Sequence, residues 1–498
     1  MTASFPPGKL DWLAWFALVP LLKSLENESP SHAFRWGLVM GFAHYLTLTY
    51  WIVVVLKHYG DLNLFISLGG LVLLCAYLSL YPAIFSFLIC YIKRGRFSIL
   101  MMATLWVGLE YIRAKALTGF PWCLLGYTQY RHLNLIQIAE LVGVYGLSFL
   151  ILLANALIYT LFFDRNRISR RWLKWEMPII LLIAVFTLAY GHHRLSGEEA
   201  EEKSKKPINI AIIQGNIDQS VKWNPLYQQK TLDTYHRLTR TTYSFKPNMI
   251  VWPETSVPFF FQNDTNLSRK IFEIPEESGA HLIFGSPAYR REDTAIKYYN
   301  RAYHLSPDNK SPGYYDKVHL VPFGEYVPLQ KFFPFIHRLV PAAGDFVSGE
   351  KIAPLKLPNL PAGILICFEV IFPELARKQA KKGAKILINL TNDAWYGKTS
   401  APYQHLCMAV FRSVETGKPM IRAANTGFSA FISPRGKIIA HGELFTEEVL
   451  KHRVKVGDSP QRFYTRYGDL FAIALLIISL IKIFHVLCYN LFSPKENR

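Results

Sequence analysis

The sequence predicts an integral membrane protein that joins a bundle of membrane-spanning helices to one α/β domain outside the bilayer. The chain of 498 residues is 51% hydrophobic, and its mean hydropathy of +0.15 exceeds that of an ordinary soluble protein. The apolar residues are also unevenly placed. They dominate from about residue 10 to 190 and again from about 470 to 491, while the region between has ordinary globular composition. Stretches of about 20 apolar residues are long enough to cross a bilayer.

Seven apolar segments are candidate membrane spans. They cover residues 10–24, 34–56, 64–91, 98–115, 134–163, 174–191 and 469–491. The first six belong to a predicted membrane domain, 1–195. The seventh belongs to a C-terminal segment, 456–498, which ends in a predicted cytoplasmic tail.

Basic residues beside these spans predict their orientation. Two loops carry most of them, at Lys93, Arg94, Arg96, Arg165, Arg167, Arg170, Arg171 and Lys174. Basic loops stay on the cytoplasmic side, and two spans separate these loops, so both can be cytoplasmic. The span at 174–191 then carries the region from about 192 to 468 to the outer side. The last span returns Lys495 and Arg498 to the cytoplasm, and the N-terminus lies outside.

The net charge of +19 has a membrane explanation. Much of the basic charge flanks apolar spans, where it sets topology and meets anionic lipid. We therefore expect no nucleic-acid partner.

The cysteines indicate neither a metal site nor a disulfide framework. Of six, only Cys367 and Cys407 lie in the polar region, and no pair has CxxC spacing. A bridge between these two remains an open alternative.

The polar region predicts a layered α/β domain at 208–455, after a charged, flexible linker at 196–207. Strand-like runs alternate with helical ones, as α/β domains require. The expected strands are 208–214, 248–252, 281–285, 363–366, 385–390 and 428–432. The expected helices are 225–245, 266–279, 372–382 and 403–417.

Three segments of this domain carry candidate catalytic residues. Cys367 ends the apolar run 363–366, Glu254 ends a second apolar run, and Lys317 follows Tyr315-Asp316. A thiol, a carboxylate and an amine at strand ends can form a nucleophile with a base and a cation. Taken singly, each has a plainer alternative: a buried thiol, a solvated carboxylate and a surface lysine.

The contexts of these residues resemble the nitrilase superfamily, and within it the membrane-embedded apolipoprotein N-acyltransferases. The matching contexts are Val-Trp-Pro-Glu254, Asp-Lys317-Val-His-Leu-Val-Pro-Phe-Gly-Glu325 and Ile-Cys367-Phe-Glu369, with further motifs at 118–122, 214–223 and 392–397. The resemblance covers nearly the whole chain. It implies an αββα sandwich for the polar domain.

The resemblance also implies roles for the three residues. Cys367 is the expected nucleophile, and Glu254 is the base that takes the thiol proton and later returns it. Lys317 and the backbone N–H of Phe368 are expected to hold the oxyanion of the tetrahedral intermediate.

Three further residues match family positions. Glu325 is expected to orient Lys317 or the leaving group. Trp223 and Glu369 match positions linked to activity, although Trp223 could equally be packing and Glu369 could equally cap the following helix.

The family transfers an acyl chain from a phospholipid, typically phosphatidylethanolamine, to the α-amino group of a lipoprotein's diacylglyceryl-cysteine. The resemblance therefore implies a ping-pong reaction through a Cys367 thioester, as the final step of lipoprotein maturation. It implies no cofactor and no metal. The expected location is the bacterial inner membrane, with the catalytic domain on the periplasmic side.

Aromatic residues follow two of the motifs and are expected to gate lipid access. They are Phe259, Phe260, Phe261, Phe332, Phe333 and Phe335. Aromatic side chains favour the membrane interface, so these loops are expected to dip into it. Packing of the same loops onto the domain is the alternative.

The sequence departs from the family in two respects. The family usually has eight spans, whereas this chain starts near the expected end of the first one, so that helix is absent or the true start lies upstream. Many members also have Tyr after the nucleophile, where this chain has Phe368. Phe368 cannot supply the hydroxyl that Tyr has, but its backbone N–H is unchanged.

Two other functions fit some of these observations. A membrane-tethered amidase would use the same three residues and release the acyl group to water, but a tether needs only one span. A transporter or receptor with a decayed outer domain would not keep all three residues intact. Its spans would also hold more ionisable residues than His44 and Glu110.

Overall fold

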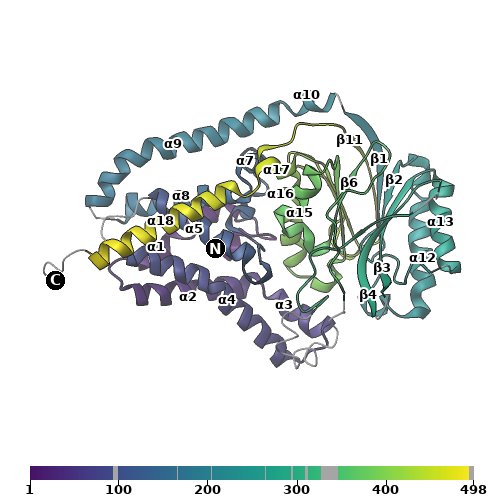
Figure 1. Cartoon of the computed structure of the whole chain (residues 1–498), viewed down its shortest axis with the longest axis horizontal. Helices are drawn as coiled ribbons and strands as arrows, with labels where there is room; N and C mark the ends of the chain where they lie inside the picture. The colour runs from purple at the N-terminus through teal and green to yellow at the C-terminus, as the bar shows by residue number, and fades with distance from the viewer. Residues whose placement is uncertain are drawn as a thin grey trace. The chain divides into compact units, whose positions relative to one another are not determined.

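The computed structural model describes residues 1–92, 99–164, 167–203, 205–263, 265–292, 295–308, 312–326 and 346–492. The basic loop at 93–96, Arg165, and the tail with Lys495 and Arg498 lie outside these ranges. The chain divides into two compact units. One comprises Met1–Tyr50, Leu68–Leu195 and Tyr467–Arg498, and the other comprises Trp51–Ser67 and Ser196–Arg466. Figure 1 shows the elements of both.

The regular secondary structure in the described residues of the first unit is all helical. Its α-helices are α1 (Val19–Ser24), α2 (Pro30–Leu48), α4 (Leu64–Tyr91), α5 (Ile99–Lys115), α6 (Leu133–Ile136), α7 (Ala139–Val142), α8 (Val144–Phe162), α9 (Arg167–Ser196) and α18 (Leu470–Phe492). Four segments of them are long and apolar enough to cross a membrane: Leu64–Tyr91, Val144–Phe162, Leu173–Ser196 and Leu470–Tyr489. A fifth is added if Pro30–Leu48 and Trp51–Tyr59, which meet at a bend of 50°, count as one span.

Three expected spans differ from the observed helices. Residues 10–24 form a 3-10 helix and the six-residue α1, which starts at Val19 and has Pro20 in its first turn, where the missing N–H breaks no hydrogen bond within the helix. The segment 134–163 breaks at Gly143, whose φ of 66° is favoured only by glycine. The segment 98–115 forms α5, a helix of 17 residues that buries Glu110 and Arg113. The number of membrane crossings stays a prediction.

The second unit contains two mixed β-sheets. The first has the order β11-β1-β2-β3-β4-β5 and the second has the order β10-β9-β8-β7-β6. The strands of the first are β1 (Lys206–Gln214), β2 (Met249–Val251), β3 (His281–Glu292), β4 (Ala295–Leu305), β5 (Gly313–Asp316) and β11 (Glu448–Val456). Those of the second are β6 (Ala362–Ile366), β7 (Ile386–Thr391), β8 (Met420–Ala424), β9 (Ala430–Ile432) and β10 (Ile438–His441). Strands β1 to β3 are parallel, and so are β6 to β8.

The two sheets pack face to face, with helices on their outer faces. Ile210 and Ile212 of β1 share one buried cluster with Ile364 and Ile388 of the second sheet. Alternate residues of β1 pack instead against α12 (Pro225–Arg240) and α13 (Asn266–Ser278). Helices α15 (Pro373–Lys381) and α16 (Ala401–Thr416) contact the second sheet (Figure 1). The central strands β2, β6, β7 and β8 are buried along their whole length, and the four layers match the αββα sandwich that the resemblance implied.

The expected flexible linker at 196–207 is ordered where the structure describes it. It contains helix α10 (Glu198–Lys203), and β1 already begins at Lys206. The Glu, Ala and Lys run consists of good helix formers. Glu201 also accepts hydrogen bonds from Arg435 at 2.7 Å and Arg462 at 3.1 Å, which fixes this helix to the sandwich.

A segment remote in sequence completes the second unit. Residues Trp51–Ser67 contain helix α3 (Trp51–Val54) and one π-helical turn, η3 (Val55–Tyr59). The expected span 34–56 runs straight into this segment, so hydropathy alone does not reveal the change of unit at Trp51.

Candidate active site

Strand ends position the three expected catalytic residues. Cys367 directly follows β6 and Lys317 directly follows β5, while Glu254 lies three residues after β2. The chain turns sharply at two of these ends, because Cys367 has a φ of 48° and Thr255 a φ of 49°. Positive φ is uncommon outside glycine and often marks a functional constraint. These turns end the strands where their side chains meet.

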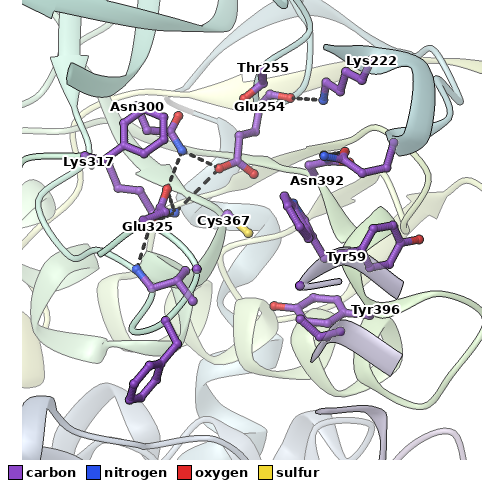
Figure 2. A pocket seen from close by; sticks show the side chains of 18 of the residues that line it. Tyr59, Lys222, Glu254, Thr255, Asn300, Lys317, Glu325, Cys367, Asn392 and Tyr396 are labelled. Carbon is purple, nitrogen blue, oxygen red and sulfur yellow. Dashed lines mark hydrogen bonds and ion pairs between the residues drawn. The ribbon is translucent and has the colours of Figure 1, made fainter. Parts of the chain in front are cut away.

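One cavity of about 350 Å³ brings the three residues together. Glu254, Lys317 and Cys367 all line it, and so do Glu325 and Trp223. Figure 2 shows the Cys367 sulfur between the group formed by Glu254, Lys317 and Glu325 and the rings of Tyr59 and Tyr396. Five of the residues singled out in the sequence therefore share one site.

A hydrogen-bonded network fixes the charged wall of the cavity. The Lys317 ammonium lies 2.9 Å from Glu325 Oε2 and 3.7 Å from Glu254 Oε1. The Asn300 amide donates to Oε1 of both carboxylates at 2.8 Å. Burial alone would lower the pKa of Lys317, but Glu325 and Glu254 outweigh it and raise that pKa. Lys317 is therefore a permanent cation at the site.

The two carboxylate oxygens of Glu254 have different surroundings. Oε1 receives Asn300 and faces Lys317. The buried Oε2 accepts no hydrogen bond from any residue in the described part of the chain. A buried acceptor left open in this way is suited to receive a proton.

Cys367 is a buried thiol that stays protonated at neutral pH. Burial raises the pKa of Cys367 to about 12, Glu254 adds to this rise, and Lys317 opposes it. A thiol in this state becomes a nucleophile only when a base takes its proton during attack. The site thus requires Glu254 to act at the moment of bond formation.

Hydrogen bonds to Glu369 hold the turn that contains Cys367. Its carboxylate accepts the N–H groups of Ile366 at 2.7 Å, Val318 at 2.7 Å and His319 at 3.1 Å, and the Tyr315 hydroxyl at 3.0 Å. Burial raises the pKa of Glu369 to about 7, against the effect of these donors. The side chain therefore caps its own turn and ties it to the segment after Lys317.

Of the other residues expected at the site, one lies at the cavity and two are buried in the domain. Trp223 is 48% exposed at the cavity, which does not fit the alternative of core packing. Phe368 is buried, and its ring contacts Phe372 at a centroid distance of 5.2 Å. The gating role does not fit Phe261, a core residue whose ring packs on Phe284 and Tyr303.

For the remaining aromatic residues the gating role stays a prediction. Phe259 packs partly against the core, and the Phe260 ring contacts Tyr289 and Tyr298. Phe332, Phe333 and Phe335 lie outside the described residues.

Sequence reasoning missed Asn300 and Lys222. Lys222 is fully buried, lines the cavity, and donates to the main-chain oxygen of Glu254 at 3.2 Å. Burial lowers the pKa of Lys222 to about 8, although Glu254 opposes this. Its place beside Trp223 in a matching motif was the available signal, but a lysine in a polar segment is normally exposed.

Sequence reasoning also missed a buried polar cluster behind the nucleophile. Asp393 pairs with Arg422 at 2.7 Å and His405 at 3.0 Å, and accepts from the Thr391 hydroxyl at 2.9 Å. Burial favours a raised pKa for Asp393, but Arg422 and His405 outweigh it and hold that pKa low. Thr391 also acts on the Cys367 thiol, whose pKa it lowers against the effect of burial. The cluster thus connects β7 and β8 to the nucleophile.

Cys407 takes no part in the site. It is not joined to Cys367 by a disulfide, and its thiol donates to the Gln404 carbonyl at 2.9 Å. The alternative of a bridge between them is not realised.

Two family models match the chain. Residues 1–157 match the apolipoprotein N-acyltransferase N-terminal domain, and residues 209–461 match the carbon-nitrogen hydrolase domain. These two matches correspond to the helical region and to the sandwich.

Whole-chain relatives carry the same name as the first of these models. An apolipoprotein N-acyltransferase of Geobacter metallireducens is 45% identical over 95% of this chain and 90% of its own length. One from Pasteurella multocida is 31% identical over 97% of this chain and 92% of its own. Among solved structures, a carbon-nitrogen hydrolase from Helicobacter pylori G27 aligns with a TM-score of 0.39 and 18% identity, covering 50% of this chain and 89% of that one.

Proposed function

Because the chain belongs to the apolipoprotein N-acyltransferase family, we propose that it acylates lipoproteins through a thioester on Cys367. It is a membrane-embedded acyltransferase with a carbon-nitrogen hydrolase domain. The proposed donor is a phospholipid such as phosphatidylethanolamine, and the proposed acceptor is the α-amino group of a diacylglyceryl-cysteine. The observation that carries the proposal is the shared cavity of Cys367, Glu254 and Lys317.

The first half-reaction forms the thioester. The Cys367 sulfur attacks the carbonyl carbon of the donor ester while Glu254 Oε2 takes the thiol proton. The carbonyl oxygen becomes an oxyanion, which Lys317 and the N–H of Phe368 stabilise. When the intermediate collapses, the ester C–O bond breaks and Glu254 returns the proton to the leaving alkoxide. Lysophospholipid departs and the acyl group stays on sulfur.

The second half-reaction transfers the acyl group to nitrogen. The acceptor's amine attacks the thioester carbonyl, and Glu254 takes a proton from the nitrogen. Collapse of the second intermediate breaks the C–S bond, and the departing sulfur recovers the proton from Glu254. The products are the amide and the free thiol, so atoms and charges balance.

The environment of each group supports this division of roles. The high pKa of Cys367 means that a proton must move in each half-reaction, and Oε2 of Glu254 is the open acceptor beside it. Lys317, held by Glu325 and Asn300, keeps its charge throughout. Glu325 thus acts as a positioning residue for Lys317.

Transfer is favoured over hydrolysis by the names of the whole-chain relatives. The same matches make the chain an enzyme and not a transporter or receptor. We further propose that it resides in the bacterial inner membrane with its second unit on the periplasmic side, which the basic loops of the sequence support.

The test is a search for the thioester. Purified protein is incubated with phosphatidylethanolamine in mixed micelles, and the Cys367 peptide is examined by mass spectrometry for an added acyl group. A diacylated lipopeptide is then added, and the acyl mass is expected to move to its N-terminus. Absence of the adduct in the wild type, or its persistence in Cys367→Ala, would end the proposal.

A further inference from the structure

The active-site cavity has two unlike walls. One carries the paired charges of Glu254, Lys317 and Glu325. The other is apolar and aromatic, and part of it comes from the remote segment Trp51–Ser67. The lining residues on this side that matter here are Val55, Leu56, Tyr59, Trp395 and Tyr396.

The π-helical turn Val55–Tyr59 presents its apolar side chains to the cavity. Val55, Leu56 and Tyr59 are partly buried and line it, whereas Lys57 and His58 between them are exposed. Single π-helical turns occur often at functional sites. The turn therefore separates a cavity-facing apolar side from a polar side.

Tight packing holds this turn against the sandwich. The Trp51 indole donates to Gln404 at 3.1 Å, and its ring meets Tyr396 edge-on at a centroid distance of 5.1 Å. The Tyr59 ring meets Trp395 in the same manner at 5.3 Å. A Cβ on Gly397 would lie 3.3 Å from the Val54 side chain, so this side chain packs closely on the Gly397 backbone. The apolar wall is thus a fixed surface.

The Cys367 sulfur faces the apolar wall, which is therefore where the acyl chain is expected to lie. An acyl carbonyl under attack must have its oxygen near Lys317, on the charged side. Its hydrocarbon chain must extend in another direction. Methylenes placed against the charged wall would separate the carboxylates from their hydrogen-bond donors, and a buried charge without partners is costly. In Figure 2 the sulfur faces Tyr59 and Tyr396 on the opposite side.

We propose that Val55, Leu56, Tyr59, Trp395 and Tyr396 form an acyl-chain subsite that holds the hydrocarbon chain, from the carbonyl outward, in the donor and in the thioester. This inference rests on the proposed function and adds to it a determinant of acyl-chain selectivity. The ligand of the subsite is a saturated hydrocarbon chain. Each methylene that the subsite buries should raise the rate of acylation about fourfold.

The experiment compares donors that differ only in chain length. Phosphatidylethanolamines with two identical saturated chains of 8, 12 or 16 carbons are presented at one mole fraction in mixed micelles. The rate of acyl-adduct formation on Cys367 is measured for the wild type, Leu56→Trp and Leu56→Ala. Ile439→Trp, on an exposed position of β10 outside the cavity, controls for added bulk.

Each variant has a directional expectation. Leu56→Trp fills the subsite, so its rate with the 16-carbon donor should fall at least tenfold relative to the 8-carbon donor. Leu56→Ala enlarges the subsite, so a donor with a methyl branch near the carbonyl should gain at least threefold over its straight-chain counterpart. Ile439→Trp should keep the wild-type ratios.

The outcomes separate this inference from the proposed function. An unchanged chain-length ratio in Leu56→Trp, together with an unchanged ratio of branched to straight donor in Leu56→Ala, would overturn the subsite and leave the thioester mechanism intact. An equal loss of rate with every donor would overturn it too, because that result indicates general damage. No adduct in the wild type with any donor would overturn the proposed function, and the subsite with it.

Discussion

At the scale of single residues, Lys222 lends itself to a sharp test. Its ammonium bonds to the main-chain oxygen of Glu254, directly before the positive φ of Thr255. Lys222→Met would leave that buried oxygen without its donor, at a cost of about 1–3 kcal/mol. We expect Cys367 acylation to slow about 10- to 100-fold, because the turn that aims Glu254 relaxes.

The measurement is the single-turnover rate of acyl-adduct formation. Lys230→Met is the matched control, since Lys230 is exposed on α12. Lys222→Arg should recover part of the rate because it restores a cationic donor. A wild-type rate in Lys222→Met would show that the Glu254 turn holds without this bond.

Glu369 makes stability depend on pH. Its pKa is about 7 in the folded protein against an ordinary value of 4.5, with burial as the main cause. A carboxyl with a raised pKa contributes stability that is fully present below about pH 4.5 and lost as pH rises through about 7. Across this pH range the free energy of unfolding falls by about 3 kcal/mol.

Thermal unfolding in detergent at a series of pH values measures this effect. Between pH 4.5 and 7 the wild type should lose stability relative to Glu369→Gln, which has no charge to bury. Parallel pH profiles for the two proteins would contradict the expectation.

Single residues also mark the limit of sequence reasoning. Glu254, Lys317 and Cys367 could be predicted because each lies in a recognisable motif beside a strand. Asn300 could not, since it lies within β4 among residues with no motif, and only the fold brings its amide to two carboxylates. The burial of Lys222 is likewise a tertiary property.

At the scale of elements, β3 passes unusually close to the catalytic turn. A Cβ on Gly285 would lie 2.4 Å from the Thr255 nitrogen and 2.7 Å from the Glu254 Cα. Gly285→Ala therefore forces the turn to move, and we expect a loss of about 1–3 kcal/mol in stability, as for other overpacked sites, together with slower acylation.

Gly313→Ala is the control for this change. Gly313 lies on β5, and an added Cβ there would be in ordinary contact, 3.4 Å from His304. Unfolding temperature and acylation rate are measured for both variants. Equal behaviour of the two would mean that the approach of β3 does not constrain Glu254.

Two of the strands that sequence reasoning missed, β4 and β8, carry polar residues in the core. The sequence predicts β1, β2, β3, β6, β7 and β9 as apolar runs. Strand β8 carries Arg422, which is fully buried because Asp393 pairs with it, and β4 carries Asn300 and Arg301. Runs of apolar residues do not predict a strand where buried polar residues contribute to the site.

At the scale of the whole molecule, topology is the open prediction. The basic loops predict that the second unit lies outside the cytoplasm and that the C-terminal tail lies within it. A membrane-impermeant thiol reagent should therefore label Lys451→Cys, an exposed position on β11, in cells whose outer membrane is permeabilised.

Lys495→Cys, in the tail, should be labelled only after the inner membrane is also opened. The unmodified protein gives the background from its six native cysteines. Labelling of the two positions in the reverse order would invert the predicted topology.

The pairing of β1 with β11 sets the order of events during synthesis. All nine residues of β1 pair with β11, from Lys206 with Val456 to Gln214 with Glu448. The segment Trp51–Tyr59 leaves the ribosome roughly 350 residues earlier than the Trp395, Tyr396 and Gln404 side chains that it packs against. At about 5–20 residues per second, that interval is roughly 20–70 s. The nascent chain therefore carries an apolar surface without its partner for most of translation, which makes this stretch a natural client for chaperones that guard growing chains.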